Sequence, residues 1–189
     1  PKDPAGAVKV LARGATQDID VGKTHFIDGN KAPQTRYFCN TTDVGLGGET
    51  AARVNNTSKA LGGFVSFLYG VIVTLFLYKS KVVTLLIDDE ISLEGLATTL
   101  VVTNGRYFGG GMKIAPEAEL DDGQLDILFL PHFSKLQLLW YLPRLYKGTH
   151  INIAGVKYFK GKKVKVSSEE ELVFEIDGET PGKAPIEIE

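Results

Sequence analysis

The amino-acid sequence predicts a mainly β domain of the α+β class, with a β-sandwich-like or barrel-like sheet and two to three helices. Short apolar segments rich in β-branched residues recur along the chain and are separated by glycine turns. Helical patterns interrupt these segments, and no internal repeat is present. The 189 residues, 43% of them hydrophobic and 23% charged, have the profile of a folded globular chain.

The first predicted elements are a helix and three strands. Asp3 suits the N-cap of a helix that ends at Gly14, and Pro4 suits its first turn. A hairpin turn is predicted at residues 28–31, and the polar, glycine-rich residues 40–48 are predicted to form a loop. The strands are predicted at residues 16–21, 24–27 and 36–39.

Two helices are predicted next, at residues 49–54 and 58–78. In the longer one, apolar residues recur at helical spacing from Phe64 to Leu75, and others fill the opposite side. A helix that is apolar on all sides is usually buried. We therefore expect burial within the protein or in an interface between two copies of the chain, with contact to lipid as the alternative.

The rest of the chain alternates between strands and one further helix. Ser134 and Gln137 form a capping-box pattern at its start, Pro143 predicts a kink, and Gly148 ends it. The strands are predicted at residues 82–87, 91–93, 96–103, 125–130, 156–159, 163–167, 172–176 and 186–188.

Charge, cysteine content and hydropathy exclude several classes of protein. A net charge of −2 provides no positive field for nucleic acid, so we expect no such partner. The single cysteine, Cys39, excludes a disulfide framework and a cysteine zinc site and fits a reducing cytosol. The most apolar stretch, residues 64–77, is shorter than the roughly 20 residues of a membrane-spanning helix. The chain begins at Pro1, and its only methionine is Met112. We therefore expect that an N-terminal segment of a longer protein precedes it.

Common catalytic motifs are absent. The sequence contains no G-x-S-x-G elbow, H-E-x-x-H pair, Walker A loop or Rossmann fingerprint. We interpret His25, His132 and His150, which are scattered in sequence, as surface or capping residues. The lysines between residues 157 and 165 are interpreted as a solvated sheet face, with an anionic membrane surface as the alternative.

Three segments carry residues suited to binding or catalysis. Residues 103–116 contain three consecutive glycines between an arginine and a lysine, which favours a functional surface over a bulged β-turn. Residues 119–124 place adjacent carboxylates before a glycine, which suits a plain turn or a hard cation. Residues 174–182 end a strand with Asp177 and Glu179, which are either solvated carboxylates or include a general base.

Together these segments resemble one family. Residues 104–116 (Asn-Gly-Arg-Tyr-Phe-Gly-Gly-Gly-Met-Lys-Ile-Ala-Pro), 120–126 (Leu-Asp-Asp-Gly-Gln-Leu-Asp), 146–150 (Tyr-Lys-Gly-Thr-His) and 177–179 (Asp-Gly-Glu) look like the diacylglycerol-kinase type of bacterial lipid kinase. Sphingosine and ceramide kinases are more distant members. The resemblance covers nearly the whole chain but only the carboxyl-terminal part of the family. The Gly-Gly-Asp-Gly-Thr loop that holds ATP in the family's amino-terminal domain does not occur here.

The resemblance implies a domain organisation and an activity. Residues 1–13 would form a helix trailing from the ATP-binding domain, and residues 14–189 the C-terminal domain of a diacylglycerol kinase and NAD kinase-like fold. The complete protein would be a cytoplasmic kinase that transfers the γ-phosphate of ATP to a lipid hydroxyl with Mg²⁺. This part would be inactive without the nucleotide-binding domain. The expected partners are that domain, the lipid substrate, a second copy of the chain and the inner face of the membrane.

The resemblance also implies residue roles. Glu179 matches the proposed base that takes the proton of the lipid hydroxyl, and Asp122 matches the aspartate of a Mg²⁺ site completed by the carbonyls of Glu119 and Gln124. The cleft near the phosphates would be lined by Asn104, Gly105, Arg106, Gly109, Gly110 and Gly111. Many relatives carry Gly-x-Gly-Phe-Asp-Ala where this chain has Val-Gly-Leu-Gly-Gly at 44–48, which leaves the choice of substrate open.

Two other functions stay open. One is a non-catalytic lipid- or membrane-binding β-domain that has lost its kinase partner. The other is a kinase that acts on a soluble acceptor such as NAD, against which the Asp-Gly-Glu turn and the Leu-Asp-Asp-Gly turn argue.

Overall fold

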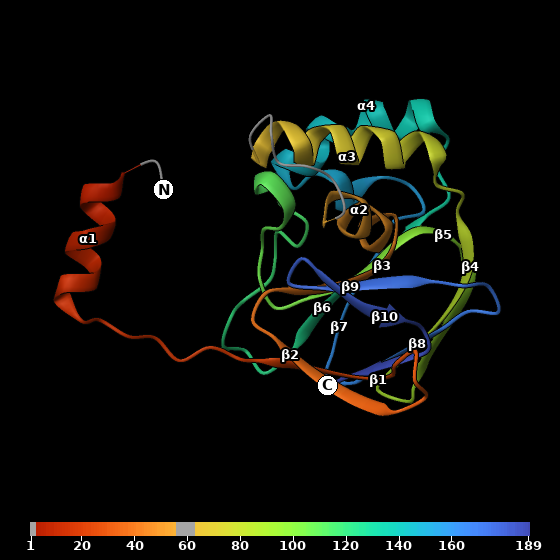
Figure 1. Ribbon diagram of the computed structural model, residues 1–189, viewed down its shortest axis with the longest axis horizontal. Coiled ribbons are helices and arrows are strands. Elements are labelled where there is room, and N and C mark those ends of the chain that lie inside the picture. The colour runs from red at the N-terminus through yellow and green to blue at the C-terminus, as the bar shows by residue number, and fades with distance from the viewer. Residues whose placement is uncertain (1–2, 56–62) are drawn as a thin grey trace.

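The computed structural model describes residues 3–55 and 63–189, the side chains of residues 63–68 excepted. In this part of the chain, eleven strands and four α-helices are present (Figure 1). The helices are α1 (Pro4–Arg13), α2 (Leu46–Asn55), α3 (Gly63–Leu77) and α4 (Lys135–Lys147). The strands are β1 (Gly22–Ile27), β2 (Pro33–Phe38), β3 (Thr41–Gly45), β4 (Lys81–Ile87), β5 (Ile91–Thr103), β6 (Leu125–Pro131), β7 (Lys157–Gly161), β8 (Val164–Ser167), β9 (Val173–Ile176), β10 (Glu179–Lys183) and β11 (Ile186–Ile188).

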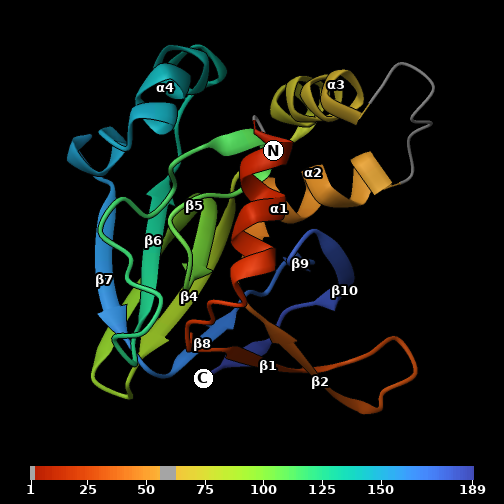
Figure 2. The same cartoon turned by 90° about the vertical axis from the view of Figure 1, so that its left-hand side faces the viewer.

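The strands form one antiparallel sheet that curls around its own interior (Figures 1 and 2). Its order is β10-β9-β3-β5-β4-β8-β11-β1-β2, and β6 and β7 branch from β5. Helices α2, α3 and α4 gather at one end of the curled sheet (Figure 1). The predicted mainly β, sandwich-like α+β fold is confirmed.

The main core fills the inside of the curl. Side chains alternate between buried and partly exposed along β4, which is the pattern that predicted this strand. The fully buried core residues include Leu85, Ile87, Leu100, Ile127, Phe174 and Ile188. Their burial supplies the apolar area that stabilises the fold.

The predicted loop at residues 40–48 is wrong. Residues 41–45 form β3, which is buried throughout and lies between β5 and β9. Its polar side chains are tolerated because the sheet supplies partners: the hydroxyl of Thr42 donates to the carbonyl oxygen of Glu175 at 2.6 Å. The strand lacks the alternation on which the prediction relied.

Three further predictions of strands are corrected. Residues 16–21 pair with no strand, because the backbone of Asp20 bonds to Leu120 and to the side chain of Asn104 instead. The segments 91–93 and 96–103 form one continuous strand, β5. The structure also contains β10, which is not predicted because Pro181 and Gly182 disfavour a strand. Strand β10 lies at the edge of the sheet and contains a bulge, and such a strand accommodates both residues.

The predicted caps of the first and last helices agree with the structure. The side chain of Asp3 caps α1, both capping-box hydrogen bonds of Ser134 and Gln137 form at α4, and Gly148 ends α4 with a positive φ. Helix α1 buries no residue and stands apart from the sheet (Figures 1 and 2). The predicted boundary between residues 1–13 and 14–189 stays a prediction.

Helix α3 is not buried on all sides within this chain, and its burial in an interface between two copies or against lipid stays a prediction. Tyr69 and Phe76 are 60% and 56% exposed, whereas Leu75 is buried. Only one side of its described part packs against the rest of the molecule. Residues 58–62 of the predicted helix lie outside the described residues. No helix in the described part of the chain combines the length and hydropathy needed to cross a membrane.

Candidate functional site

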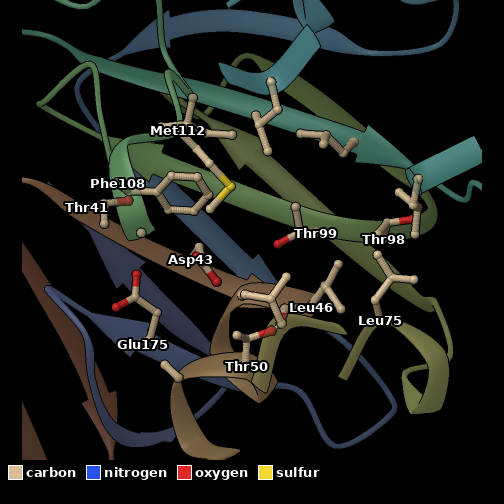
Figure 3. Close-up of a pocket in the computed structure, with 18 of the residues that line it drawn as sticks. Thr41, Asp43, Leu46, Thr50, Leu75, Thr98, Thr99, Phe108, Met112 and Glu175 are labelled. Carbon is tan, nitrogen blue, oxygen red and sulfur yellow. The ribbon is translucent and has the colours of Figure 1, made fainter. Parts of the chain in front are cut away.

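A cavity of about 650 Å³ lies between the curled sheet and helices α2, α3 and α4 (Figure 3). Its walls are mainly apolar, and its size falls within the range of about 300–1,000 Å³ that is typical of small-molecule sites. The helices contribute Leu46 and Val54 from α2, Val71 and Leu75 from α3, and Leu138, Tyr141, Leu142 and Leu145 from α4.

The three consecutive glycines shape one wall of this cavity. Gly109, Gly110 and Gly111 have φ values of 29°, 68° and 89°, in the region that disfavours residues with a side chain. The tight reversal lets Phe108 and Met112 exchange two backbone hydrogen bonds of 3.0 Å. Both side chains line the cavity (Figure 3). The glycines are therefore explained by the turn that brings these two residues to the wall.

Two acidic side chains line the polar end of the cavity. Asp43 on β3 lies opposite Glu175 on β9 in the register of the sheet, and their side chains are 2% and 4% exposed as whole residues (Figure 3). Burial, together with the charge of Glu175, raises the pKa of Asp43 well above its usual value. Burial raises the pKa of Glu175 to about 7. Both shifts favour the protonated forms of the two carboxyls.

A tightly held turn follows Glu175. The carboxylate of Asp177 accepts hydrogen bonds from the backbone N–H groups of Cys39, Asn40 and Thr41 at 2.9, 3.2 and 2.8 Å. Glu175 accepts one from the N–H of Gly178 at 2.5 Å. The φ values of Asp177 and Gly178 are 45° and 89°, which suits an Asp-Gly pair. The turn that precedes Glu179 is thus fixed to the start of β3.

Glu179 begins β10 immediately after this turn. Its side chain is 77% exposed and lies 3.7 Å from Nη1 of Arg36. It does not line the large cavity, although its neighbours Asp177 and Gly178 do; it borders a smaller hollow with Arg36 and Tyr37. The predicted base thus lies beside one edge of the cavity and faces outward.

The residues predicted to line a phosphate-binding cleft differ in exposure and in the contacts they make. Asn104 is buried, and its amide donates to the carbonyl oxygen of Asp20 at 2.8 Å. A Cβ atom at Gly105 would lie 2.1 Å from Oδ1 of Asn40, so a side chain there would force Asn40 to move. Arg106 is exposed and donates through Nε to the carbonyl oxygen of Ala118 at 2.6 Å. These contacts explain the segment structurally, and its role toward phosphate stays a prediction.

Asp122 is held by a cation of the protein itself. Lys160 Nζ lies 2.6 Å from its Oδ2, and the N–H of Gln124 donates to its Oδ1 at 3.0 Å. The hydrogen bond from Lys160 lowers the pKa of Asp122. Among the described residues, no three His, Cys, Asp or Glu side chains are grouped to hold a metal. Oxygen donors of the kind that Mg²⁺ prefers are present, but an ion on Oδ2 would have to displace Lys160.

The histidines and the lysine strip are also accounted for. His150 is not a surface residue: it is buried, its Nε2 lies 3.0 Å from the carbonyl oxygen of Ile114, and its ring also contacts the backbone of Arg144 in the last turn of α4, as a capping residue does. His132 is exposed and His25 is partly exposed. In the strip, Lys163 and Lys165 pair with Glu187 and Asp89, which agrees with a solvated face.

Asp43 and Glu175 were missed as site residues. Asp43 lies in the segment for which the sequence predicts a loop, and nothing in the sequence distinguishes Glu175 from the other residues of its predicted strand. Only the pairing of β3 with β9 brings the two together. The fully polar run Asn-Thr-Thr-Asp at residues 40–43 is the local signal.

Comparisons with known proteins agree with the fold. Residues 41–189 match the family described as the YegS C-terminal NAD kinase beta sandwich-like domain. A diacylglycerol kinase of Staphylococcus haemolyticus (strain JCSC1435) is 29% identical over 98% of this chain and 53% of its own length. One of Staphylococcus aureus (strain JH9) is 29% identical over 98% of this chain and 56% of its own length.

A solved structure is also similar. A protein from Bacillus anthracis str. Sterne, provisionally described as a diacylglycerol kinase, superposes with a TM-score of 0.71 at 26% identity, over 100% of this chain and 58% of its own. The chain therefore spans about half the length of the relatives that it matches.

Proposed function

Because the chain belongs to the family of the YegS C-terminal NAD kinase beta sandwich-like domain, we propose that it is the acceptor-side domain of an ATP-dependent lipid kinase. The relatives named diacylglycerol kinase support a kinase family. The proposal makes two more specific claims. The phosphate acceptor is a lipid alcohol, and the nucleotide binds to a further lobe of the protein that lies outside this chain.

The observation that carries the proposal is the apolar cavity beside the turn of Asp177, Gly178 and Glu179. An acyl chain would bury its apolar surface among the side chains of α2, α3 and α4, which releases roughly 0.8 kcal/mol for each CH₂ group removed from water. The acidic side chains of the lining lie toward the turn, so a bound lipid would direct its hydroxyl there.

In this proposal Glu179 takes the proton of the lipid hydroxyl. The hydroxyl oxygen attacks the γ-phosphorus of ATP, the bond from that phosphorus to the bridging oxygen breaks, and ADP leaves with the electron pair. Positioning of the hydroxyl and removal of its proton are what this chain's residues contribute. The outward position of Glu179 suits a base that works across a cleft between two lobes. The hydrogen bonds of Asp177 would hold it in place.

Mg²⁺ would supply positive charge to the phosphates when bound. If a cation binds this domain, Asp122 is the carboxylate that would hold it, together with backbone carbonyls of Glu119 and Gln124, after Lys160 moves away. In the observed arrangement, Lys160 already provides a positive charge at that position. The proposed ATP and Mg²⁺ dependence therefore needs separate tests.

We also propose that the outer sides of α3 and α4 contact the membrane. Leu136 and Trp140 on α4 are 78% and 77% exposed, and Phe76 and Leu77 on α3 are also exposed. Inner residues of both helices line the cavity, so the two helices would separate the bilayer from the lipid site (Figure 1). Replacing Leu136 and Trp140 by Ser should weaken binding to phosphatidylglycerol vesicles, and unchanged sedimentation with them would contradict this contact.

The kinase proposal is tested with the full-length protein, which in this proposal carries the nucleotide-binding lobe. ATP labelled at the γ-phosphate is offered with diacylglycerol, phosphatidylglycerol, sphingosine or NAD. We expect transfer to a lipid, reduced at least 100-fold by Glu179→Gln. Glu169→Gln, a change at another exposed glutamate, should have no effect.

Three outcomes would contradict parts of this proposal. Transfer to NAD alone would favour the soluble acceptor. Lipid binding without any transfer would favour the non-catalytic lipid-binding domain. Full activity of Glu179→Gln would remove Glu179 as the base.

A further inference from the structure

The acidic pair inside the cavity is costly to bury, although the two side chains hydrogen-bond to each other and the backbone of Gly48 donates to Asp43. Asp43 and Glu175 are cross-strand neighbours, and like charges in such positions destabilise a sheet. In the described part of the chain, neither carboxyl forms an ion pair. An apolar pair of similar size would pack in the same place at lower cost in stability.

The surrounding polar groups leave one oxygen of the pair without a partner. Thr42 donates its hydroxyl to the carbonyl oxygen of Glu175 at 2.6 Å, and Thr99 donates its own to the carbonyl oxygen of Val44 at 2.9 Å. Both hydroxyls are therefore committed to the backbone. Within the described residues, Oδ1 of Asp43 is buried without a hydrogen-bond partner. Such an orphaned acceptor calls for a ligand or an ordered water.

The start of α2 is shaped around this carboxyl. A Cβ atom at Gly47 would lie 2.1 Å from both carboxylate oxygens of Asp43. A Cβ atom at Gly48 would lie 2.5 Å from the carbonyl oxygen of Val173 on β9. The two glycines thus let the first turn of α2 approach the pair closely, and Gly47 leaves room for the side chain of Asp43 at the cavity wall.

The pair also lies next to the proposed reaction centre. Glu175 accepts the N–H of Gly178, the residue immediately before Glu179. A lipid whose reacting hydroxyl reaches Glu179 would therefore place the rest of its head group near Glu175 and Asp43. Carboxyl groups in this position accept hydrogen bonds, and they recognise a ligand that offers one.

We propose that Asp43 and Glu175 form a head-group subsite that accepts a hydrogen bond from a second donor of the lipid, a hydroxyl or an amide N–H beside the reacting hydroxyl. This inference rests on the proposed function and specifies its substrate class. A 1,2-diacylglycerol has a single hydroxyl, which the reaction uses, and it leaves the subsite unsatisfied. Lipids with two donors, such as monoacylglycerols or N-acyl amino alcohols, satisfy it.

Matched lipids test the subsite through binding to the 189-residue chain. One pair is 1-oleoylglycerol and its 2-O-methyl ether, which lacks one hydroxyl donor. The other is N-oleoylethanolamine and 2-hydroxyethyl oleate, in which the amide N–H becomes an ester oxygen. Dissociation constants are measured by displacement of a fluorescent fatty-acyl probe. We expect wild type to prefer the donor-bearing lipid of at least one pair by about tenfold or more, and the preferred pair identifies the donor.

Variants assign the preference to the pair. Asp43→Val should reduce the preference to about twofold or less, and Glu175→Leu, which also removes an acceptor, provides a second variant if Asp43→Val does not fold. Leu138→Ala, in the apolar wall, should weaken both lipids of a pair equally. Equal affinity for both lipids in wild type, or a preference that survives both variants, overturns the subsite while leaving lipid binding intact. Failure of every lipid to bind would overturn the proposed function as well.

Discussion

Two acidic sites of this domain contrast sharply. Asp122 has a cation at 2.6 Å and a backbone donor, and its pKa is lowered, chiefly by the hydrogen bond from Lys160. Asp43 and Glu175 face each other in a buried strand pair, and burial raises both pKa values. The first arrangement is what a stable surface turn requires. The second destabilises the fold at neutral pH, and such sites are retained where function needs them.

The largest expected effect is the pH dependence of the buried pair. The folded state binds the proton of Glu175 more tightly than the unfolded state does, so this group's effect on stability is absent below about pH 4.5. It becomes increasingly unfavourable as the pH rises to about 7. Glu175→Gln should therefore be as stable as wild type at pH 4.5 and more stable at pH 8, by about 3 kcal/mol. Urea unfolding at both pH values measures the difference.

A matched control sharpens this test. Glu169→Gln changes an exposed glutamate and should leave the difference between the two pH values as it is in wild type. A Glu175→Gln variant that is less stable than wild type at pH 8 would show that the pair supports the fold, and the contrast between the two sites would disappear.

The second effect concerns the turn that holds Glu179. Asp177→Ala removes the acceptor of three backbone N–H groups and places alanine at a φ of 45°. We expect a loss of about 2 kcal/mol in unfolding free energy. Asp177→Asn keeps one acceptor oxygen and tolerates this φ, so it should lose about half as much. Thermal unfolding of both variants checks the order, and equal stability of Asp177→Ala and wild type would contradict the anchoring role.

The smallest expected effect on stability concerns Asp122 and its ion pair with Lys160. Because the folded pKa of Asp122 is lowered, its contribution is present at neutral pH and is lost as the pH falls through that pKa. Asp122→Asn should lower the unfolding free energy at pH 7 by at most about 1 kcal/mol, since the pair is partly solvated. If Mg²⁺ displaces Lys160, added Mg²⁺ should raise the melting temperature of wild type and not of Asp122→Asn. An identical response of both proteins would reject this metal site.

The contrast also explains what the sequence predicts and what it does not. Local patterns predict strands β4 and β11, in which buried and partly exposed side chains alternate. They also predict the capping box of α4. They do not predict strand β3, because its threonines and Asp43 are buried by tertiary pairing that supplies their partners. The motif around Asp177 and Glu179 identified the turn. The partnership of Asp43 with Glu175 depends on strand register between distant segments, which no local pattern encodes.

A photoreactive lipid tests the central claim most directly. An oleoylglycerol with a diazirine in the middle of its acyl chain is bound to the protein, irradiated, and its attachment sites are mapped by mass spectrometry. We predict attachment to cavity-lining residues of α2 and α4, such as Val54, Leu138 and Leu142, competed by unlabelled oleoylglycerol. Attachment confined to outward-facing residues such as Leu136 and Trp140, or none that unlabelled lipid displaces, would contradict a lipid site within this domain.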